Sequence, residues 1–508
     1  MAATCTASLA TVSTPGHSAR ATLLHVLPPE LLSVILLHLD TRSLARLAAT
    51  CRPLWLDTPT PPQPALLPRE IGPVEAELRR RAQRDLRIDS SLPKGGLLWV
   101  PYLLKCVLRD ALRREAPLEA GYKCSLFVDA EGRLHTCGSE RGKLLGHAVE
   151  PDADPDRPRS IGVPTLVPSM EGRRIVSVAA GHRHCLALSC KGEVYSWGDG
   201  TDGSLGHADG GSRAVPSRIE SLGRIGSIAA GRLQTSAAVD EVGRLFTWGW
   251  ASFDAGTRLN SLALGYALDS QTESQLTPKW VEALSADRVV GVALGLGYSL
   301  AVTDAGAVFS FGDGEDGLLG HASLETEVLP QRIEALAQTG FRFVAVAAGV
   351  EHALTLTEDG ELYGWGGDLA NGHGRGELTP RQMVAFVGQR VKHVIAGDFS
   401  SCAVMETGEL YTWGCSTNSH LGHGRHALQG TPKRVKGLSG VKVTAAAICG
   451  SHTLVADEDG LVWAFGKRSC LGLGDPDEDV AQGPVLEPAR IPTLRVRASK
   501  SPDVLRCR

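Results

Sequence analysis

Two histidines at a spacing that suits metal binding are the first residues of chemical interest. His182 and His184 form a His-x-His pair, but a complete site needs three or four converging ligands. The second histidine also belongs to an internal repeat, whose other copies carry Cys124, Gln234, Tyr298, His352, Ser400 and His452 at the same point. A position that accepts such different side chains is structural, so we expect no metal there.

A glycine-rich segment at residues 138–144 resembles a phosphate-binding loop. It reads Gly-Ser-Glu-Arg-Gly-Lys-Leu, which is one residue shorter than the nucleotide-binding pattern and ends in Leu instead of Ser or Thr. It is also in phase with turns in the other copies of the repeat. No Ser-His-Asp or Cys-His order indicates a nucleophile. We therefore predict that the chain is not an enzyme and binds no cofactor.

The composition restricts the possible classes of protein further. With 43% hydrophobic residues, 21% charged residues and a net charge of −4, the 508-residue chain has no basic excess to draw it to nucleic acid. The 12 cysteines include no Cys-x-x-Cys pair, which favours free thiols in a reducing compartment. No apolar run reaches ~18 residues, the length that spans a membrane. We expect a cytoplasmic or nuclear protein, whose residues 1–24 form a disordered tail rather than an organelle transit peptide.

The elements that hold these residues form a sevenfold repeat that begins near Ala116. Its turn glycines are Gly132, Gly192, Gly243, Gly306, Gly360, Gly408 and Gly460. Five residues after each of them comes a residue that is itself followed by glycine: Cys137, Trp197, Trp248, Phe311, Trp365, Trp413 and Phe465. A leading glycine precedes each turn, except that Cys449 takes this place in the seventh copy. Leu-Gly-His follows in four copies.

Each copy predicts four short strands. Apolar segments on both sides of the turn glycine form a hairpin, and a proline-containing segment and a Val-x-x-Val-Ala-Ala segment supply two more strands. Four strands in ~50 residues make one blade of a β-propeller. The seventh copy lacks a clear last strand, so we expect residues 116–120 to complete the seventh blade. The predicted fold is mainly β, with a seven-bladed propeller over residues 116–497 and a loose tail at 498–508.

The residues before the repeat have a helical pattern. Prolines stand at the entry of an apolar run in which Leu31, Ile35 and Leu39 share one helix face, and Asp40 or Thr41 can cap a second helix. We assign residues 25–56 to a small all-α domain and residues 57–115 to a proline-rich linker and further helices. One of these helices is rich in arginine, but nearby acids balance it, which favours a solvated helix over a nucleic-acid patch.

Both regions resemble known families. The repeat, with its Ala-Gly, Trp-Gly and Leu-Gly-His landmarks, resembles the regulator of chromosome condensation repeat over about three-quarters of the chain. Residues 25–56 resemble the F-box, from Leu-Pro-x-Glu-Leu-Leu at the start to Cys-Arg-x-Leu-Trp at the end.

The F-box resemblance implies docking on the Skp-type adaptor of a cullin-RING ubiquitin ligase, with a second domain that binds the protein to be ubiquitinated. The residues that the resemblance assigns to the adaptor interface are Leu27, Pro28, Leu31, Leu32, Ile35, Leu36, Leu39, Leu44, Leu47 and Trp55. A short helical unit this apolar cannot bury its surface alone, which also indicates an interface. The alternative is that these helices pack on the propeller. Our first hypothesis is a non-catalytic, substrate-recruiting subunit of a Skp/cullin/F-box ligase, whose substrate is an unknown protein.

The propeller resemblance implies a second hypothesis. Proteins with this propeller include a nucleotide exchanger for a small GTPase and a plant UV-B photoreceptor. The exchanger also binds chromatin through a basic tail, whereas residues 1–25 here hold one arginine and no lysine. The photoreceptor uses tryptophans that have no counterpart at the corresponding positions here. Regulation of a small GTPase, without chromatin docking or UV-B sensing, is therefore the alternative function.

The third copy is longer than the others between its Trp-Gly and Leu-Gly landmarks. The extra segment contains Trp250, Phe253 and Arg258, which are residue types that anchor protein partners. We expect this segment to form a partner-binding loop. A tolerated surface insertion is the alternative.

Overall fold

The computed structural model of the protein describes residues 116–140, 142–148, 160–232, 234–250, 263–268, 274–367, 369–426, 428–474 and 483–496. These residues belong to one compact unit, Leu112–Lys500, and a second unit comprises Met1–Ala111 and Ser501–Arg508. The predicted F-box-like helices, the linker and both tails lie outside the described residues. Among the described residues, no helix is long and apolar enough to cross a membrane.

The described chain forms seven antiparallel sheets of four strands, and in each sheet the strands pair in chain order. Blades 1 to 4 consist of β1 (Leu118–Ala120), β2 (Cys124–Val128), β3 (Leu134–Ser139), β4 (Ser160–Leu166), β5 (Ile175–Ala180), β6 (His184–Ser189), β7 (Val194–Gly198), β8 (Arg213–Arg218), β9 (Ile225–Ala230), β10 (Thr235–Asp240), β11 (Leu245–Trp250), β12 (Ser274–Trp280), β13 (Val289–Leu294), β14 (Tyr298–Thr303), β15 (Val308–Gly312) and β16 (Glu327–Arg332). Blades 5 to 7 consist of β17 (Phe343–Ala348), β18 (His352–Thr357), β19 (Leu362–Gly366), β20 (Glu377–Gln382), β21 (Val391–Ala396), β22 (Ser400–Met405), β23 (Leu410–Gly414), β24 (Gln429–Arg434), β25 (Val443–Ile448), β26 (His452–Asp457), β27 (Leu461–Gly466) and β28 (Val485–Arg495).

Short helical turns connect several of the strands. They are η3 (Pro168–Met170), η4 (Glu282–Leu284), η5 (Glu315–Gly317), α6 (Glu334–Ala337), η6 (Val384–Phe386), η7 (Lys436–Leu438) and η8 (Arg468–Cys470). Five of them follow an outer strand, and η5 and η8 follow the third strand of their blades.

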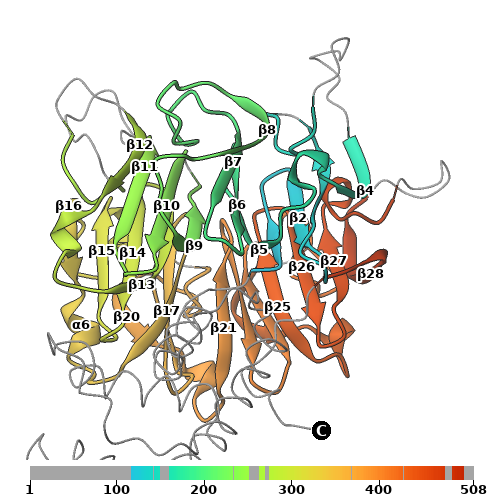
Figure 1. The fold of residues 1–508 in the computed structure, drawn as a ribbon. Helices are drawn as coiled ribbons and strands as arrows, with labels where there is room; N and C mark the ends of the chain where they lie inside the picture. The colour runs from blue at the N-terminus through green and yellow to red at the C-terminus, as the bar shows by residue number, and fades with distance from the viewer. Residues whose placement is uncertain are drawn as a thin grey trace, which may run out of the picture. The chain divides into compact units, whose positions relative to one another are not determined.

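The seven sheets close into a ring. The first strand of each blade contacts the first strand of the next, and β1 of blade 1 contacts β25 of blade 7. Figure 1 shows the result, with the blue first blade beside the red seventh blade. The seven-bladed propeller that the repeat predicted is therefore confirmed.

The closing strand is where the prediction was wrong. Residues 118–120 form β1, the inner strand of blade 1, which pairs with β2 in the register Leu118↔Phe127. The fourth strand of blade 7 is β28, which pairs with β27 in the register Trp463↔Arg490. The Ala-Ala strand hydrogen-bonds to the hairpin that follows it and not to the hairpin that precedes it. Each blade is thus one continuous piece of chain, and the ring closes by packing, by an isolated bridge between Asp129 and Val496 and by hydrogen bonds from Ser125.

The aromatic residue of each Trp-Gly pair joins its blade to the preceding one. The indole of Trp248 is fully buried and donates from Nε1 to the carbonyl of Ser204 at 2.8 Å. Gly206 lies against this ring with φ at +75°, and a Cβ there would be 3.0 Å from Nε1. Trp197, Trp365 and Trp413 donate in the same way to Leu144, Leu318 and Ala370. The Trp-Gly and Leu-Gly landmarks are therefore the two sides of one interface between blades.

Every outer strand carries a proline at an equivalent position, and β28 carries a second one at Pro492; the equivalent prolines are Pro164, Pro216, Pro278, Pro330, Pro380, Pro432 and Pro488. A proline has no backbone N–H to offer another strand. The exposed edge of every blade is therefore protected against pairing with a further chain.

Candidate functional site

One face of the ring carries the loops that vary most between blades. In a four-stranded meander, the loops between the first and second strands and between the third and fourth strands lie at the same end of the sheet. We call this the channel-mouth face. The residues that follow the leading position in its inner loops are Tyr122, His182, Arg232, Leu296, Val350, Asp398 and Gly450. All seven differ, although the position before them is glycine in six blades.

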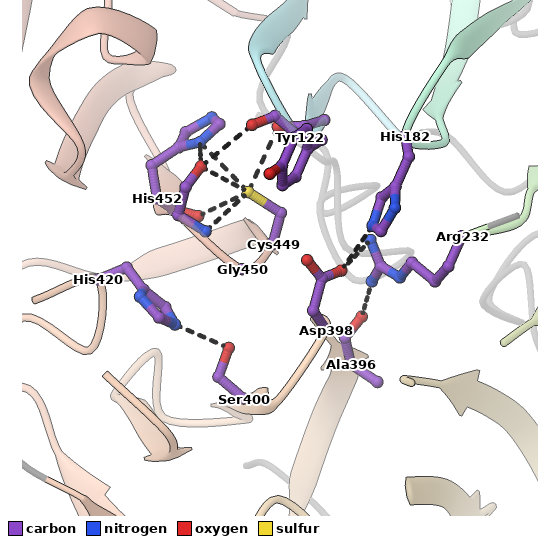
Figure 2. A network of polar contacts seen from close by, with 12 residues as sticks. Tyr122, His182, Arg232, Ala396, Asp398, Ser400, His420, Cys449, Gly450 and His452 are labelled. Carbon is purple, nitrogen blue, oxygen red and sulfur yellow. Dashed lines mark hydrogen bonds and ion pairs between the residues drawn. The ribbon is translucent and has the colours of Figure 1, made fainter. Parts of the chain in front are cut away.

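Three of these residues meet across the ring. The carboxylate of Asp398, from blade 6, lies 3.3 Å from Nε2 of His182 in blade 2 and 3.2 Å from Nη1 of Arg232 in blade 3. The Arg232 guanidinium also donates from Nη2 to the backbone carbonyl of Ala396 at 2.7 Å. Figure 2 shows both side chains converging on Asp398. We call His182, Arg232 and Asp398 the clasp.

The clasp is buried and charged. Arg232 and Asp398 are 8% and 5% exposed, so their charges are largely shielded from water. Burial opposes ionisation of Asp398, but the hydrogen bond from His182 and the charge of Arg232 outweigh it and lower its pKa to about 2. Asp398 therefore stays ionised at neutral pH, and its contacts with His182 and Arg232 fix three inner loops relative to one another.

A second carboxyl group lies close to the clasp. Glu119 is on β1, at a position that the register equates with Ala179, Ala229, Ala293, Ala347, Ile395 and Ala447 in the other inner strands. Burial raises the pKa of Glu119 to about 8, and the charge of Arg232 only partly offsets this effect. Glu119 is thus mainly protonated at neutral pH.

Exposed aromatic side chains border the clasp. The ring of Tyr122 stands 5.0 Å from the imidazole of His182, and Nζ of Lys123 lies 5.3 Å from the centre of the same ring. Tyr122 is 44% exposed, and Phe399, which follows Asp398, is 43% exposed. Aromatic rings held in this way are suited to bind a protein partner.

The repeat histidines and the glycine-rich segment, which suggested reactive chemistry in the sequence, have structural positions in the blades. Nε2 of His184 hydrogen-bonds Oγ of Ser236 in the next blade at 2.8 Å, and burial lowers the pKa of this histidine to about 4. Its structural role is therefore confirmed. The Leu-Gly-His histidines bond a hydroxyl of their own blade, as His207 does to Ser196 at 2.9 Å. In the 138–144 segment, Gly138 and Ser139 end β3, and the other described residues belong to the turn that follows.

The partner-binding loop predicted in the third copy is only partly described. Trp250 ends β11 and is half-buried, and its backbone N–H donates to the carbonyl of Gln234 at 2.9 Å. Gln234 lies in the inner loop of the same blade, so β11 ends at the channel-mouth face. Phe253 and Arg258 lie outside the described residues.

The sequence did not predict the contact between the three residues of the clasp. His182 and Asp398 are 216 positions apart, and nothing in one sequence indicates that their loops face each other. The available signal was that the residue after the leading glycine is charged or aromatic in several copies, whereas the neighbouring positions repeat.

The sequence and the fold can be compared with those of known proteins. Residues 154–502 match the family described as RCC1-like domain, and this match covers more than half of the chain. The chain belongs to the RCC1-like domain family.

Relatives of this RCC1-like domain protein include large and small proteins. It is 37% identical over 372 residues to human "E3 ubiquitin-protein ligase HERC2", in a match that covers 71% of this chain but only 7% of HERC2. It is 32% identical over 359 residues to "Ultraviolet-B receptor UVR8" of Arabidopsis thaliana, which covers 66% of this chain and 76% of the receptor. The crystal structure of Prp20p from Saccharomyces cerevisiae has the same fold, with a TM-score of 0.59 at 20% identity over 76% of this chain and 89% of that chain.

Proposed function

We propose that this RCC1-like protein is a non-catalytic regulator of a small GTPase, which it binds on the channel-mouth face of the propeller. The observation that carries the proposal is the set of seven dissimilar residues around the mouth of an otherwise repetitive ring. Repeat proteins bind partners where their repeats differ, because the repeated positions are used for packing. Structural similarity to Prp20p also supports the proposal, because the crystal structure of that protein was described together with its binding properties to Gsp1p and histones.

Binding alone would accelerate nucleotide release from the GTPase. A protein that binds the nucleotide-free form of a GTPase more tightly than the loaded form shifts the population toward release. The clasp supports this role, because Arg232 and Asp398 hold the inner loops in one arrangement before the partner arrives. Tyr122 and Phe399 are the exposed anchors on which the partner would pack.

The experiment is nucleotide release from a panel of small GTPases that carry a fluorescent GDP analogue. We expect the full chain to accelerate release from at least one of them. Tyr122→Ala combined with Phe399→Ala should reduce that acceleration tenfold or more, since anchors of this kind contribute ~2 kcal/mol. Leu329→Ala, which changes a 49%-exposed residue on an outer strand, is the matched control and should have no effect. Unchanged release across the whole panel would rule the proposal out.

A second candidate function, recruitment of a substrate to a Skp/cullin/F-box ligase, is favoured by a specific sequence observation. Residues 27–55 carry every part of the F-box pattern in order. In this proposal, the F-box-like helices bind the Skp-type adaptor and the channel-mouth face binds the substrate.

Co-purification of the full chain with the adaptor distinguishes the two candidates. Leu31→Asp combined with Ile35→Asp should abolish recovery of the adaptor, whereas Ser33→Asp on the same predicted helix should retain it. Circular dichroism checks that the propeller of each variant stays folded. If the unmodified chain recovers no adaptor, this second candidate is eliminated and the GTPase assay is unaffected.

A further inference from the structure

Neighbouring blades are joined at one repeated pair of positions. The first residue of the second strand in one blade meets the second residue of that strand in the next blade. His184 meets Ser236 at 2.8 Å, His352 meets Ser401 at 2.7 Å and His452 meets Ser125 at 2.7 Å. At these three interfaces the repeat therefore places the two side chains in contact.

Between blades 1 and 2 the same two positions hold cysteines. Cys124 begins β2 and Cys185 is the second residue of β6, and their sulfur atoms are 4.0 Å apart. Both side chains are 0% exposed. Sγ of Cys185 also lies 3.7 Å from the carbonyl oxygen of Leu144, so it is held in place on the side away from Cys124.

We propose that Cys124 and Cys185 are a modification site, at which a peroxide forms a disulfide that covalently joins blades 1 and 2. The two sulfurs need to approach by about 2 Å to reach the S–S bond length of ~2.05 Å. Rotation of two short side chains supplies a movement of this size, and the strands on either side do not need to separate.

The reaction with hydrogen peroxide balances with these two residues alone. One thiolate attacks a peroxide oxygen, the O–O bond breaks, and a sulfenic acid and hydroxide form. The second thiolate attacks the sulfenic sulfur, the S–S bond forms, and a second hydroxide leaves. The two protons released by the thiols convert both hydroxides to water. Two thiols are oxidised by two electrons, and one peroxide is reduced.

Access to the buried pair depends on local opening. The hydrogen bond with Cys185, together with burial, raises the pKa of Cys124, which keeps this thiol protonated and slows oxidation of the closed ring. The inner strand β1 of blade 1 is short, with three residues against six in β5, and Cys137 replaces the buried aromatic residue of the other blades at the interface with blade 7. Oxidation at this pair is therefore slow, and it requires a local opening between blades 1 and 2.

The consequence reaches the channel-mouth face. Cys124 is two residues after Tyr122, and Cys185 is three residues after His182 of the clasp. A bond between them fixes the inner loops of blades 1 and 2 to each other. This inference rests on the repeat geometry and does not depend on the identity of the partner.

The test uses the reduced full-length protein, treated with hydrogen peroxide under folding conditions. Remaining thiols are then alkylated, and a non-reducing digest is examined by mass spectrometry. We expect a peptide that links Cys124 to Cys185, lighter by two hydrogens than the sum of its parts, and an increase in melting temperature of roughly 5–10 °C. A reducing agent should reverse both changes.

Two variants make the result specific. Cys124→Ser should lose the linked peptide and the thermal shift, whereas Cys402→Ser, which changes another fully buried cysteine in blade 6, should keep both. The proposal is wrong if the folded protein gives no Cys124–Cys185 peptide. It is equally wrong if the peptide appears only after the chain is unfolded in urea, because the folded structure then does not bring the two cysteines together.

Discussion

The interface between blades 2 and 3 and the interface between blades 7 and 1 use the same polar contact but different packing. Ser236 bonds His184 at 2.8 Å in the first, and Ser125 bonds His452 at 2.7 Å in the second. The first interface also buries Trp248, whose indole donates to a carbonyl at 2.8 Å. At the second interface Cys137 takes that position, and its thiol lies 3.6 Å from the carbonyl of Cys470.

The difference separates two contributions that the interface between blades 2 and 3 combines. The serine–histidine contact is directional and is present at both sites, so it specifies how adjoining blades are aligned. The indole adds buried area, which is the larger source of free energy. At the interface that closes the ring, where the bonded residues are 327 positions apart, alignment is kept and the indole is absent, while Phe127 is buried in a cluster with residues of blade 7.

The largest expected effect is therefore the removal of a tryptophan. Trp248→Ala should lower the free energy of unfolding by about 3–5 kcal/mol, because it empties a large buried volume and removes one of the two donors to the carbonyl of Ser204. Cys137→Ala at the closing interface should cost about 1 kcal/mol. Urea denaturation measures both changes. Equal losses would show that the two interfaces do not differ as described.

A smaller effect is expected from the polar contact, and it should be the same at both interfaces. Ser236→Ala and Ser125→Ala each remove the partner of a buried histidine Nε2 and one hydrogen bond to a buried carbonyl, which belongs to Ser204 and Cys470 respectively. Each substitution should cost about 1–3 kcal/mol. Double-mutant cycles with His184→Ala and His452→Ala give the two coupling energies. A coupling at only one interface would contradict the common role.

A dependence of stability on pH distinguishes blade 1 from the other blades. The folded state keeps the Glu119 proton up to a pKa of about 8, whereas an ordinary glutamate releases it near 4.5. The folded state therefore binds more protons between these values, and stability should fall as pH rises from 4.5 to 8, by at most about 1.4 kcal/mol per pH unit. Glu119→Gln should remove this slope, because the amide has no proton to lose. An unchanged slope in the variant would assign the pH dependence to another group.

The amino-acid sequence predicts the fold well because the propeller is a repetition. Glycines with positive φ and buried aromatic residues recur at fixed spacing, and each recurrence indicates the same contact between neighbouring blades. The single error, the strand at residues 116–120, arose because spacing alone does not show whether the Ala-Ala segment pairs with the hairpin before it or after it. Hydrogen bonds to β2 decide the question.

The candidate site was harder to predict, for the opposite reason. His182, Arg232 and Asp398 belong to three blades, and each is an exception to the repeat. Their contact depends on the diameter of the closed ring and on the direction of three loops. Periodicity can show that these positions face the axis, but it does not show which of them meet.

That every blade is one continuous piece of chain has a consequence for how the molecule is made. Each sheet can complete its hydrogen bonds soon after its own residues leave the ribosome, because no strand must wait for a distant partner. Blade 1 can be finished before the residues of blade 7 have been synthesised. Only the closure of the ring joins distant parts of the chain. It requires blade 7 to dock on blade 1 as a finished sheet, and no strand has to be inserted.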